Sequence, residues 1–154
     1  MTTLTQVCDF LSRRRLAVVG VSRNPHDFTR TVFREFLKRG YDAVPVHPGV
    51  EAIEGHPCFA RLSEVQPPVD AALLLTRPEV TDEVVRDCAA AGVTQVWMHR
   101  ATGAGAVSSQ AVAFCETHGI RVVAGECPLM FLPDGSWFHR LHRFLRRMTG
   151  RCPR

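Results

Sequence analysis

The sequence lacks any apolar run close to the ~20 residues that a membrane-spanning helix requires. A secretory signal needs a basic segment ahead of an apolar core, and the opening stretch MTTLTQVCDFLSRRRLAVVG does not have that pattern. The composition, with 45% hydrophobic and 22% charged residues, is that of an ordinary globular domain. We therefore expect a cytoplasmic protein that does not bind membranes.

The sequence also lacks a C-x-x-C pair, and this excludes a zinc ribbon and a thioredoxin-type redox motif. Three cysteines fall on the apolar faces of predicted helices, and we expect them to be small core residues: Cys8, Cys88 and Cys115. Because cytosolic thiols stay reduced, we expect no disulfide.

Two signs of a nicotinamide dehydrogenase are missing. The turn after the first apolar run has one glycine, Gly20, and not the G-x-G-x-x-G spacing of a dinucleotide loop. The second apolar run is followed by His47, where a site for NAD needs an acidic residue for the ribose. Both absences argue against NAD as the ligand.

The net charge of +4 is unevenly distributed. Residues 139–154 hold six arginines and no acid, whereas the rest of the chain holds 13 basic and 15 acidic side chains. A general nucleic-acid surface is therefore not expected. The terminal arginines suit a solvated helix face, or a local site for an anion or a partner.

Short apolar runs alternate with helical patterns along the chain. The pattern predicts five strands, which are followed by helices at four of their ends, as in a βαβ series. The expected strands are 16–21, 42–46, 71–75, 94–98 and 121–124; the expected helices are 3–14, 29–39, 79–91, 106–118 and an amphipathic 136–148, with a helical turn near 62–64.

This alternation predicts an α/β fold with three layers, a doubly wound, Rossmann-like parallel sheet. We expect the strand order 3-2-1-4-5, counting strands along the chain. No internal repeat or linker interrupts the pattern, so residues 1–149 are predicted to form one domain and 150–154 a loose basic tail. The C-terminal helix, with Trp137 and Phe138, offers a surface for a homodimer.

The loops after the strands carry the candidate binding residues, because ligands of such sheets lie at the carboxyl ends of the strands. After the first strand, Gly20 permits close approach of a ligand, Ser22 and Asn24 offer donors, and Arg23 and Arg30 add charge near the N-terminus of the next helix. This pattern predicts a phosphate site. The alternative is a plain turn with Asn24 and Pro25 as turn residues.

Three further loops are weaker candidates. His47 and Pro48 suit a ligand contact or a loop start, and Arg77 suits a phosphate partner beside the first loop or a solvated arginine. Residues 98–105 contain a G-x-G that more often marks a connector.

Cys127 is the one candidate nucleophile, since it follows the fifth strand beside Glu126. A structural cysteine is the favoured interpretation. His139 and His142 are one helical turn apart and with Cys127 would suit a metal, but packing of their helix is favoured, so no metal is predicted.

Taken together, these loops resemble the CoA-binding protein family, whose small Rossmann-like members are similar to the CoA-binding domain of the succinyl-CoA synthetase alpha subunit. The resemblance covers residues 5–130. The matching stretches are AVVGVSRNP at 17–25, GYDAVPVHP at 40–48, IEGHPCFARLSEV at 53–65, VDAALLLTRPE at 69–79 and AAGVTQVWMH at 90–99.

The resemblance implies coenzyme A as the ligand, with its pyrophosphate at the first loop and its adenosine end between two other loops. The implied residues are Gly20, Val21, Ser22, Arg23 and Asn24 for the pyrophosphate, Val46, His47 and Pro48 for the nucleoside end, and Thr76, Arg77 and Pro78 for the adenosine or phosphate wall. Two positions depart from the family pattern, His47 and the stretch 27–29. Asp27 is expected to point away from a phosphate or to pair with Arg23 or Arg30.

Two functions are therefore expected as alternatives. The first is a noncatalytic module that binds CoA or an acyl-CoA and serves as a carrier, a sensor or a partner of an acyl-CoA enzyme. The second is a small enzyme that acts on a CoA thioester or a nucleotide-linked substrate, with Cys127 as nucleophile. A different nucleotide in the same loops is a third and weaker alternative.

Overall fold

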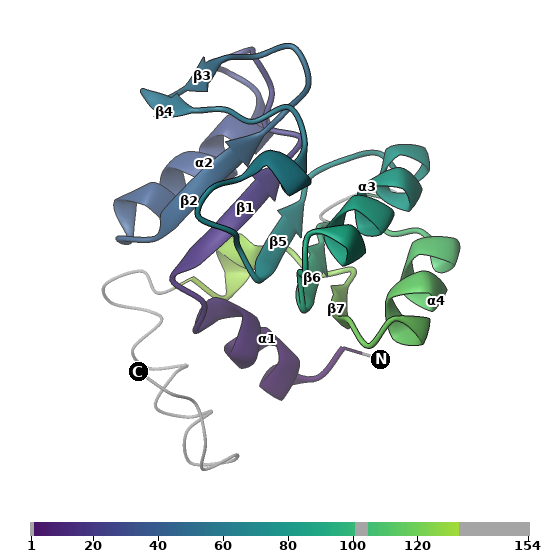
Figure 1. The fold of residues 1–154 in the computed structure, drawn as a ribbon. Coiled ribbons are helices and arrows are strands. Elements are labelled where there is room, and N and C mark those ends of the chain that lie inside the picture. Colours follow the sequence, from purple (N-terminus) through teal and green to yellow (C-terminus); the bar gives the residue numbers. More distant parts are fainter. Residues whose placement is uncertain (1, 101–104, 133–154) are drawn as a thin grey trace.

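The computed structural model describes residues 2–100 and 105–132 of the chain. Its centre is a parallel five-stranded sheet, flanked by helices (Figure 1). The strands are β1 (Arg15–Val19), β2 (Asp42–Val46), β5 (Ala71–Leu74), β6 (Gln95–Met98) and β7 (Arg121–Ala124); the helices are α1 (Leu4–Leu11), α2 (Phe28–Lys38), α3 (Pro78–Ala90) and α4 (Ser109–Thr117). The predicted α/β, Rossmann-like class is confirmed.

The strand order is β2-β1-β5-β6-β7, which is 2-1-3-4-5 when the five strands are counted along the chain. The predicted order 3-2-1-4-5 is wrong in the place of the third strand, since β5 pairs with β1. Pro45 supplies the physical reason. Its carbonyl accepts a bond on the outer side of β2, from the Phe59 N–H at 3.1 Å, so its missing N–H also faces outward. Proline is tolerated in this way on an edge strand, and β2 is one.

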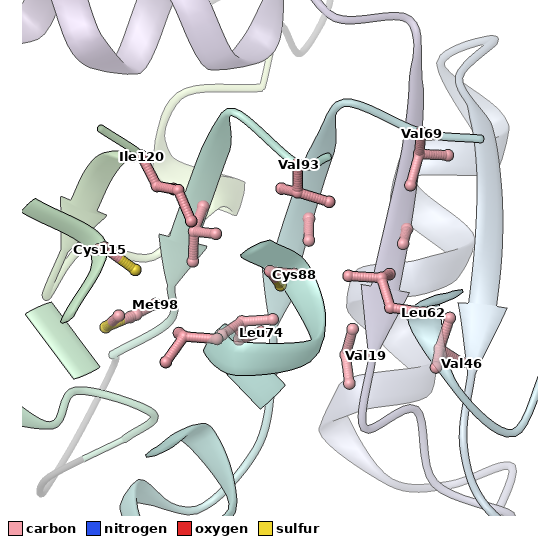
Figure 2. Packing of buried hydrophobic residues seen from close by; sticks show 14 of the residues in the cluster. Val19, Val46, Leu62, Val69, Leu74, Cys88, Val93, Met98, Cys115 and Ile120 are labelled. Carbon is pink, nitrogen blue, oxygen red and sulfur yellow. The ribbon is translucent and has the colours of Figure 1, made fainter. Parts of the chain in front are cut away.

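The core has two layers, one on each face of the sheet. Leu16 and Val18 of β1 pack with α1 and α2, whereas Ala17 and Val19 pack with α3 and α4. Figure 2 shows the second layer, where Leu74 and Met98 lie with Cys88 and Cys115. Strands buried on both faces explain the continuous Val, Ala and Leu runs of the sequence.

The helices begin at residues that satisfy the first exposed N–H groups. Thr3 and Gln6 form a reciprocal capping box at α1, Ser108 caps α4, and Pro78 is the first residue of α3. Such caps place each helix start within a few residues of its predicted position.

The connection between β2 and β5 contains a hairpin that the sequence pattern did not predict. Its strands, β3 (Ala52–Ile53) and β4 (His56–Pro57), have two residues each, and its turn residues Glu54 and Gly55 have φ angles of +52° and +75°. Strands this short carry no periodicity. The predicted helical turn is confirmed as η1 (Leu62–Glu64), and a second short turn, η2 (Pro128–Met130), follows β7.

The cysteine predictions are confirmed in part. Cys88 and Cys115 are buried free thiols of the core, as predicted. Cys8 is half-buried and disulfide-bonded, so the prediction of a reduced core residue is wrong there. Within 2–100 and 105–132, no helix is both long and apolar enough to cross a membrane. The predicted helix 136–148 and the tail 150–154 lie outside the described residues.

Candidate ligand-binding site

A cavity of about 640 Å³ opens at the carboxyl ends of three neighbouring strands. Its floor comes from the last residues of β1 and β2 and from Leu75 directly after β5, and its walls come from η1 and α3. The lining residues are Val19, Gly20, Val46, His47, Pro48, Ala60, Arg61, Leu62, Leu75, Thr76, Arg77, Val80, Glu83, Val84 and Asp87. Figure 2 shows Val19, Val46 and Leu62 close together at this end of the sheet.

The observed strand order creates this cavity. The chain leaves β1 toward β2 on one side and later returns to β5 on the other side, so the order reverses between β1 and β5. Two hydrogen bonds join the strand ends there: the Gly20 N–H donates to the Val46 carbonyl at 3.0 Å, and the Leu75 N–H donates to the Val19 carbonyl at 2.8 Å. Ligands of open α/β sheets bind at such a reversal.

Gly20 allows the two central loops to approach each other. Its φ is +91°, and a Cβ at this position would lie 3.0 Å from the carbonyl oxygen of Leu75 and 3.1 Å from the Thr76 side chain. Only glycine has both the conformation and the space. The glycine thus serves loop packing within the chain, besides any contact with a ligand.

Six of the twelve predicted binding residues line the cavity: Gly20, Val46, His47, Pro48, Thr76 and Arg77. Val21 is fully buried in the core on the α1 and α2 side, and Pro78 opens α3. The others, Ser22, Arg23, Asn24 and Arg30, belong to the loop beside the cavity and to α2.

Sequence reasoning missed the walls of the cavity. Leu62, Val80 and Val84 supply apolar surface, and Arg61, Glu83 and Asp87 supply charge. Helical periodicity identifies Val80 and Val84 as one face of α3, but it does not distinguish a core-facing residue from a cavity-facing one. Val80 is 38% exposed, which shows that this part of the face is open.

The loop from Ser22 to His26 is organised by its own side chains. The Ser22 hydroxyl accepts from the Asn24 N–H at 3.1 Å, and the Asn24 side-chain oxygen accepts from the His26 N–H at 3.0 Å. In both bonds the side-chain oxygen accepts, so the donor hydrogens of these two side chains are not used. The hydroxyl hydrogen of Ser22 and the amide hydrogens of Asn24 therefore face no partner among the described residues and suit an anionic ligand.

Asp27 caps α2 and pairs with no arginine among the described residues. Its carboxylate accepts from the Thr29 N–H at 2.8 Å and from the Thr29 hydroxyl at 2.7 Å, and that hydroxyl accepts from the Ser22 N–H at 2.8 Å. One of the first N–H groups of α2, that of Thr29, thus already binds a carboxylate at the helix start that the sequence suggested for a phosphate. The negative charge of Asp27 also opposes a phosphate there, so a phosphate at this loop must rely mainly on side chains and on the loop itself.

The positive charges of the site have different partners. Arg30 forms an ion pair with Glu54, with 2.7 Å between Nη2 and Oε1, and Arg61 Nη2 lies 3.8 Å from Asp87 Oδ1. Arg77 is exposed and forms no ion pair within the described part of the chain. Thr81 steadies its loop, because the buried Thr81 hydroxyl donates to the Arg77 carbonyl at 3.1 Å or to the Thr76 hydroxyl at 2.7 Å.

Cys127 is a half-buried free thiol between β7 and η2. Its neighbour Glu126 uses its backbone carbonyl to accept from the Trp97 indole at 2.9 Å and from the Arg100 N–H at 3.2 Å. No three His, Cys, Asp or Glu side chains gather as metal ligands within the described ranges. His139 and His142, the other members of the hypothetical metal site, lie outside them.

His99 directly follows β6, in surroundings that disfavour its protonated form. Burial lowers the pKa of His99, and its Nε2 is buried without a hydrogen-bond partner among the described residues. As the pH falls below about 6.5, the unfolded chain gains a proton at this histidine that the folded chain resists. The folded state therefore loses stability between that pH and the lowered pKa.

We expect His99→Leu to reduce this loss. Urea unfolding at pH 7.5, 6.5 and 5.5 measures it: the free energy of unfolding of the natural chain should fall more over this range than that of the variant. Equal slopes in both proteins would show that His99 does not contribute.

The doubly wound sheet places the protein among the open α/β proteins, whose ligands bind where the strand order reverses. Residues 14–133 match the family described as CoA binding domain, and the chain belongs to that family. The protein is 24% identical over 123 residues to the uncharacterised protein YneT of Bacillus subtilis (strain 168), with 79% of this chain and 88% of that protein covered.

Solved structures show the same fold. A hypothetical protein from Pyrococcus horikoshii OT3 matches with a TM-score of 0.77 and 23% identity, covering 94% of this chain and 93% of that one. A conserved hypothetical protein from Pyrococcus furiosus matches with a TM-score of 0.65 and 28% identity, covering 71% and 90%. A dinucleotide forming acetyl-coenzyme A synthetase from Ca. Korarchaeum cryptofilum matches with a TM-score of 0.64 and 24% identity, covering 73% of this chain and 26% of that one.

Proposed function

We propose that the protein binds coenzyme A or an acyl-CoA as a noncatalytic module. Membership of the CoA-binding domain family, together with a cavity at the strand-order reversal, supports this proposal. The adenosine end of CoA occupies the cavity, whose apolar lining includes Val19, Val46 and Val84 and suits an adenine ring.

The phosphates lie on two sides of that position. The pyrophosphate faces the loop from Gly20 to Asn24 and takes hydrogen bonds from the Ser22 hydroxyl, the Asn24 amide and the exposed Arg23 guanidinium. Arg77, which has no carboxylate partner within the described ranges, pairs with the 3′-phosphate. The absence of an acidic residue after β2, where His47 stands, favours this phosphate over a bare ribose.

Calorimetric titration tests the proposal. We expect saturable binding of CoA and acetyl-CoA that is at least about tenfold tighter than binding of NAD or ATP. The double variant Ser22→Ala/Arg23→Gln should weaken CoA binding roughly tenfold or more, because charge-assisted bonds to the pyrophosphate are lost. Arg86→Gln on α3 is the control, since Arg86 is exposed and does not line the cavity.

No CoA binding by the natural chain would overturn the proposal. Equal binding of NAD and CoA would favour a different nucleotide. Hydrolysis or transfer of the acyl group of acetyl-CoA would instead favour the enzyme alternative, and Cys127→Ser would then test the thiol. A cytoplasmic location, a homodimer and an acyl-CoA enzyme as partner also stay predictions.

A further inference from the structure

Glu54 lies outside the cavity but joins two arginines of α2. It occupies the turn of the hairpin formed by β3 and β4, and it is a non-glycine residue with φ of +52°. Its Oε1 accepts from Arg30 Nη2 at 2.7 Å and Nε at 3.1 Å, and from Arg34 Nε at 2.7 Å. One carboxylate oxygen thus holds two guanidinium groups.

The same two arginines hold the backbone of the loop after β1. Arg30 Nη1 donates to the carbonyls of Ser22 and Arg23, both at 3.2 Å. Arg34 Nη1 donates to the carbonyl of Pro25 at 2.9 Å. Three carbonyls of this loop are therefore tied, through Arg30 and Arg34, to Glu54.

This network is partly shielded from water. The side chains of Arg30, Glu54 and Arg34 are 12%, 25% and 44% exposed. The Arg30 hydrogen bond is the main cause that lowers the pKa of Glu54, so the carboxylate is ionised near neutral pH. Ile53 beside it is buried in the core, which anchors the hairpin. Ordering a long arginine side chain costs rotamer entropy. The charge-assisted hydrogen bonds to the Glu54 carboxylate offset this cost, so both arginines can stay in one orientation.

We propose that Glu54 is a positioning residue for the anion-binding loop, acting through Arg30 and Arg34; this inference rests on the proposed CoA function. Glu54 keeps the arginines turned toward the carbonyls of residues 22, 23 and 25. The loop is then held in one shape before ligand arrives, and preorganisation of this kind raises affinity.

The direction of the effect separates positioning from simple charge. Removal of Glu54 leaves two unpaired arginines near the loop, and that change in charge alone would tighten binding of an anion. Loss of the ordered loop would instead weaken binding of the anion. We expect Glu54→Gln to raise the Kd for CoA about tenfold, as for the loss of one coupled interaction.

The experiment compares Glu54→Gln with Glu51→Gln, an exposed glutamate just before the same hairpin whose side chain forms no ion pair within the described part of the chain. Calorimetry measures the Kd for CoA. Amide hydrogen exchange of the ligand-free proteins measures order in residues 21–27, with residues 109–117 of α4 as an internal reference. We expect faster exchange in 21–27 for Glu54→Gln but not for Glu51→Gln, and no change in α4 for either variant.

Arg34→Gln is the second variant, in case Glu54→Gln does not fold. It removes the bond to Pro25 and is expected to speed exchange in 21–27 and to weaken CoA binding less than Glu54→Gln does. Unchanged exchange in both variants would overturn the inference even if CoA does not bind at all. An unchanged or lower Kd for Glu54→Gln, with CoA bound by the natural chain, would also overturn it and leave the proposed function standing.

Discussion

Gly20→Ala is expected to lower the free energy of unfolding by about 2–4 kcal/mol. A Cβ at this position needs a left-handed conformation, with φ near +91°, and would lie 3.0 Å from the backbone oxygen of Leu75. This oxygen belongs to the backbone of Leu75, whose N–H is bonded to the carbonyl of Val19, so it cannot move away as a flexible side chain would. Urea unfolding measures the change, and CoA titration of the folded variant should show weakened binding because the loops after β1 and β5 move apart.

Gly92→Ala separates the two causes of this loss. Gly92 also has a positive φ, +78°, but a Cβ there would meet nothing within 4 Å. We expect a loss of about 1–2 kcal/mol from conformation alone and unchanged CoA binding. An equal loss in both variants would mean that the approach of Gly20 to Leu75 carries no energetic weight.

Val80→Trp is expected to raise the Kd for CoA at least thirtyfold, roughly 2 kcal/mol, while the fold is kept. Val80 lines the cavity from the first turns of α3 and is 38% exposed, so a large ring at this position extends into the cavity without entering the core. Thermal unfolding should be close to that of the natural chain, as for other changes at open surface positions.

Arg86→Trp is the matched control, since it adds the same ring to an exposed position of α3 that does not line the cavity. CoA binding should not change in this variant. CoA binding by Val80→Trp with the natural Kd would place the nucleotide elsewhere on the protein and would contradict the proposed site.

Within the described residues, the predicted helices and sheet strands agree with the observed ones because the local signals are strong. A short apolar run such as 71–75, bounded by loop residues, favours a buried strand, and Pro78 suits the first turn of the helix that follows. The hairpin at 52–57 escaped prediction because its strands are too short for a pattern. Its turn residue Glu54 is brought to Arg30 and Arg34 of α2 by tertiary packing. No periodicity or motif in the sequence relates these positions.

Strand order is a property that neighbouring strands decide together. Pro45 does carry a local clue, because a strand with an internal proline belongs at an edge, but the full order also depends on how the connections cross the sheet. The observed order puts the loop with Arg77 directly beside the loop with Gly20. In the predicted order, the second strand would have separated these two loops.

The sequence by itself thus determined the α/β class, the five strands of the main sheet, the four described helices, and the three loops that line the cavity, because periodicity, caps and turn residues act over a few positions. Only the tertiary structure decided that α3 and η1 wall the cavity, that Asp27 occupies the start of α2, and that Glu54 holds Arg30 and Arg34. These contacts join residues far apart in the chain, and their geometry depends on the packing of the whole sheet.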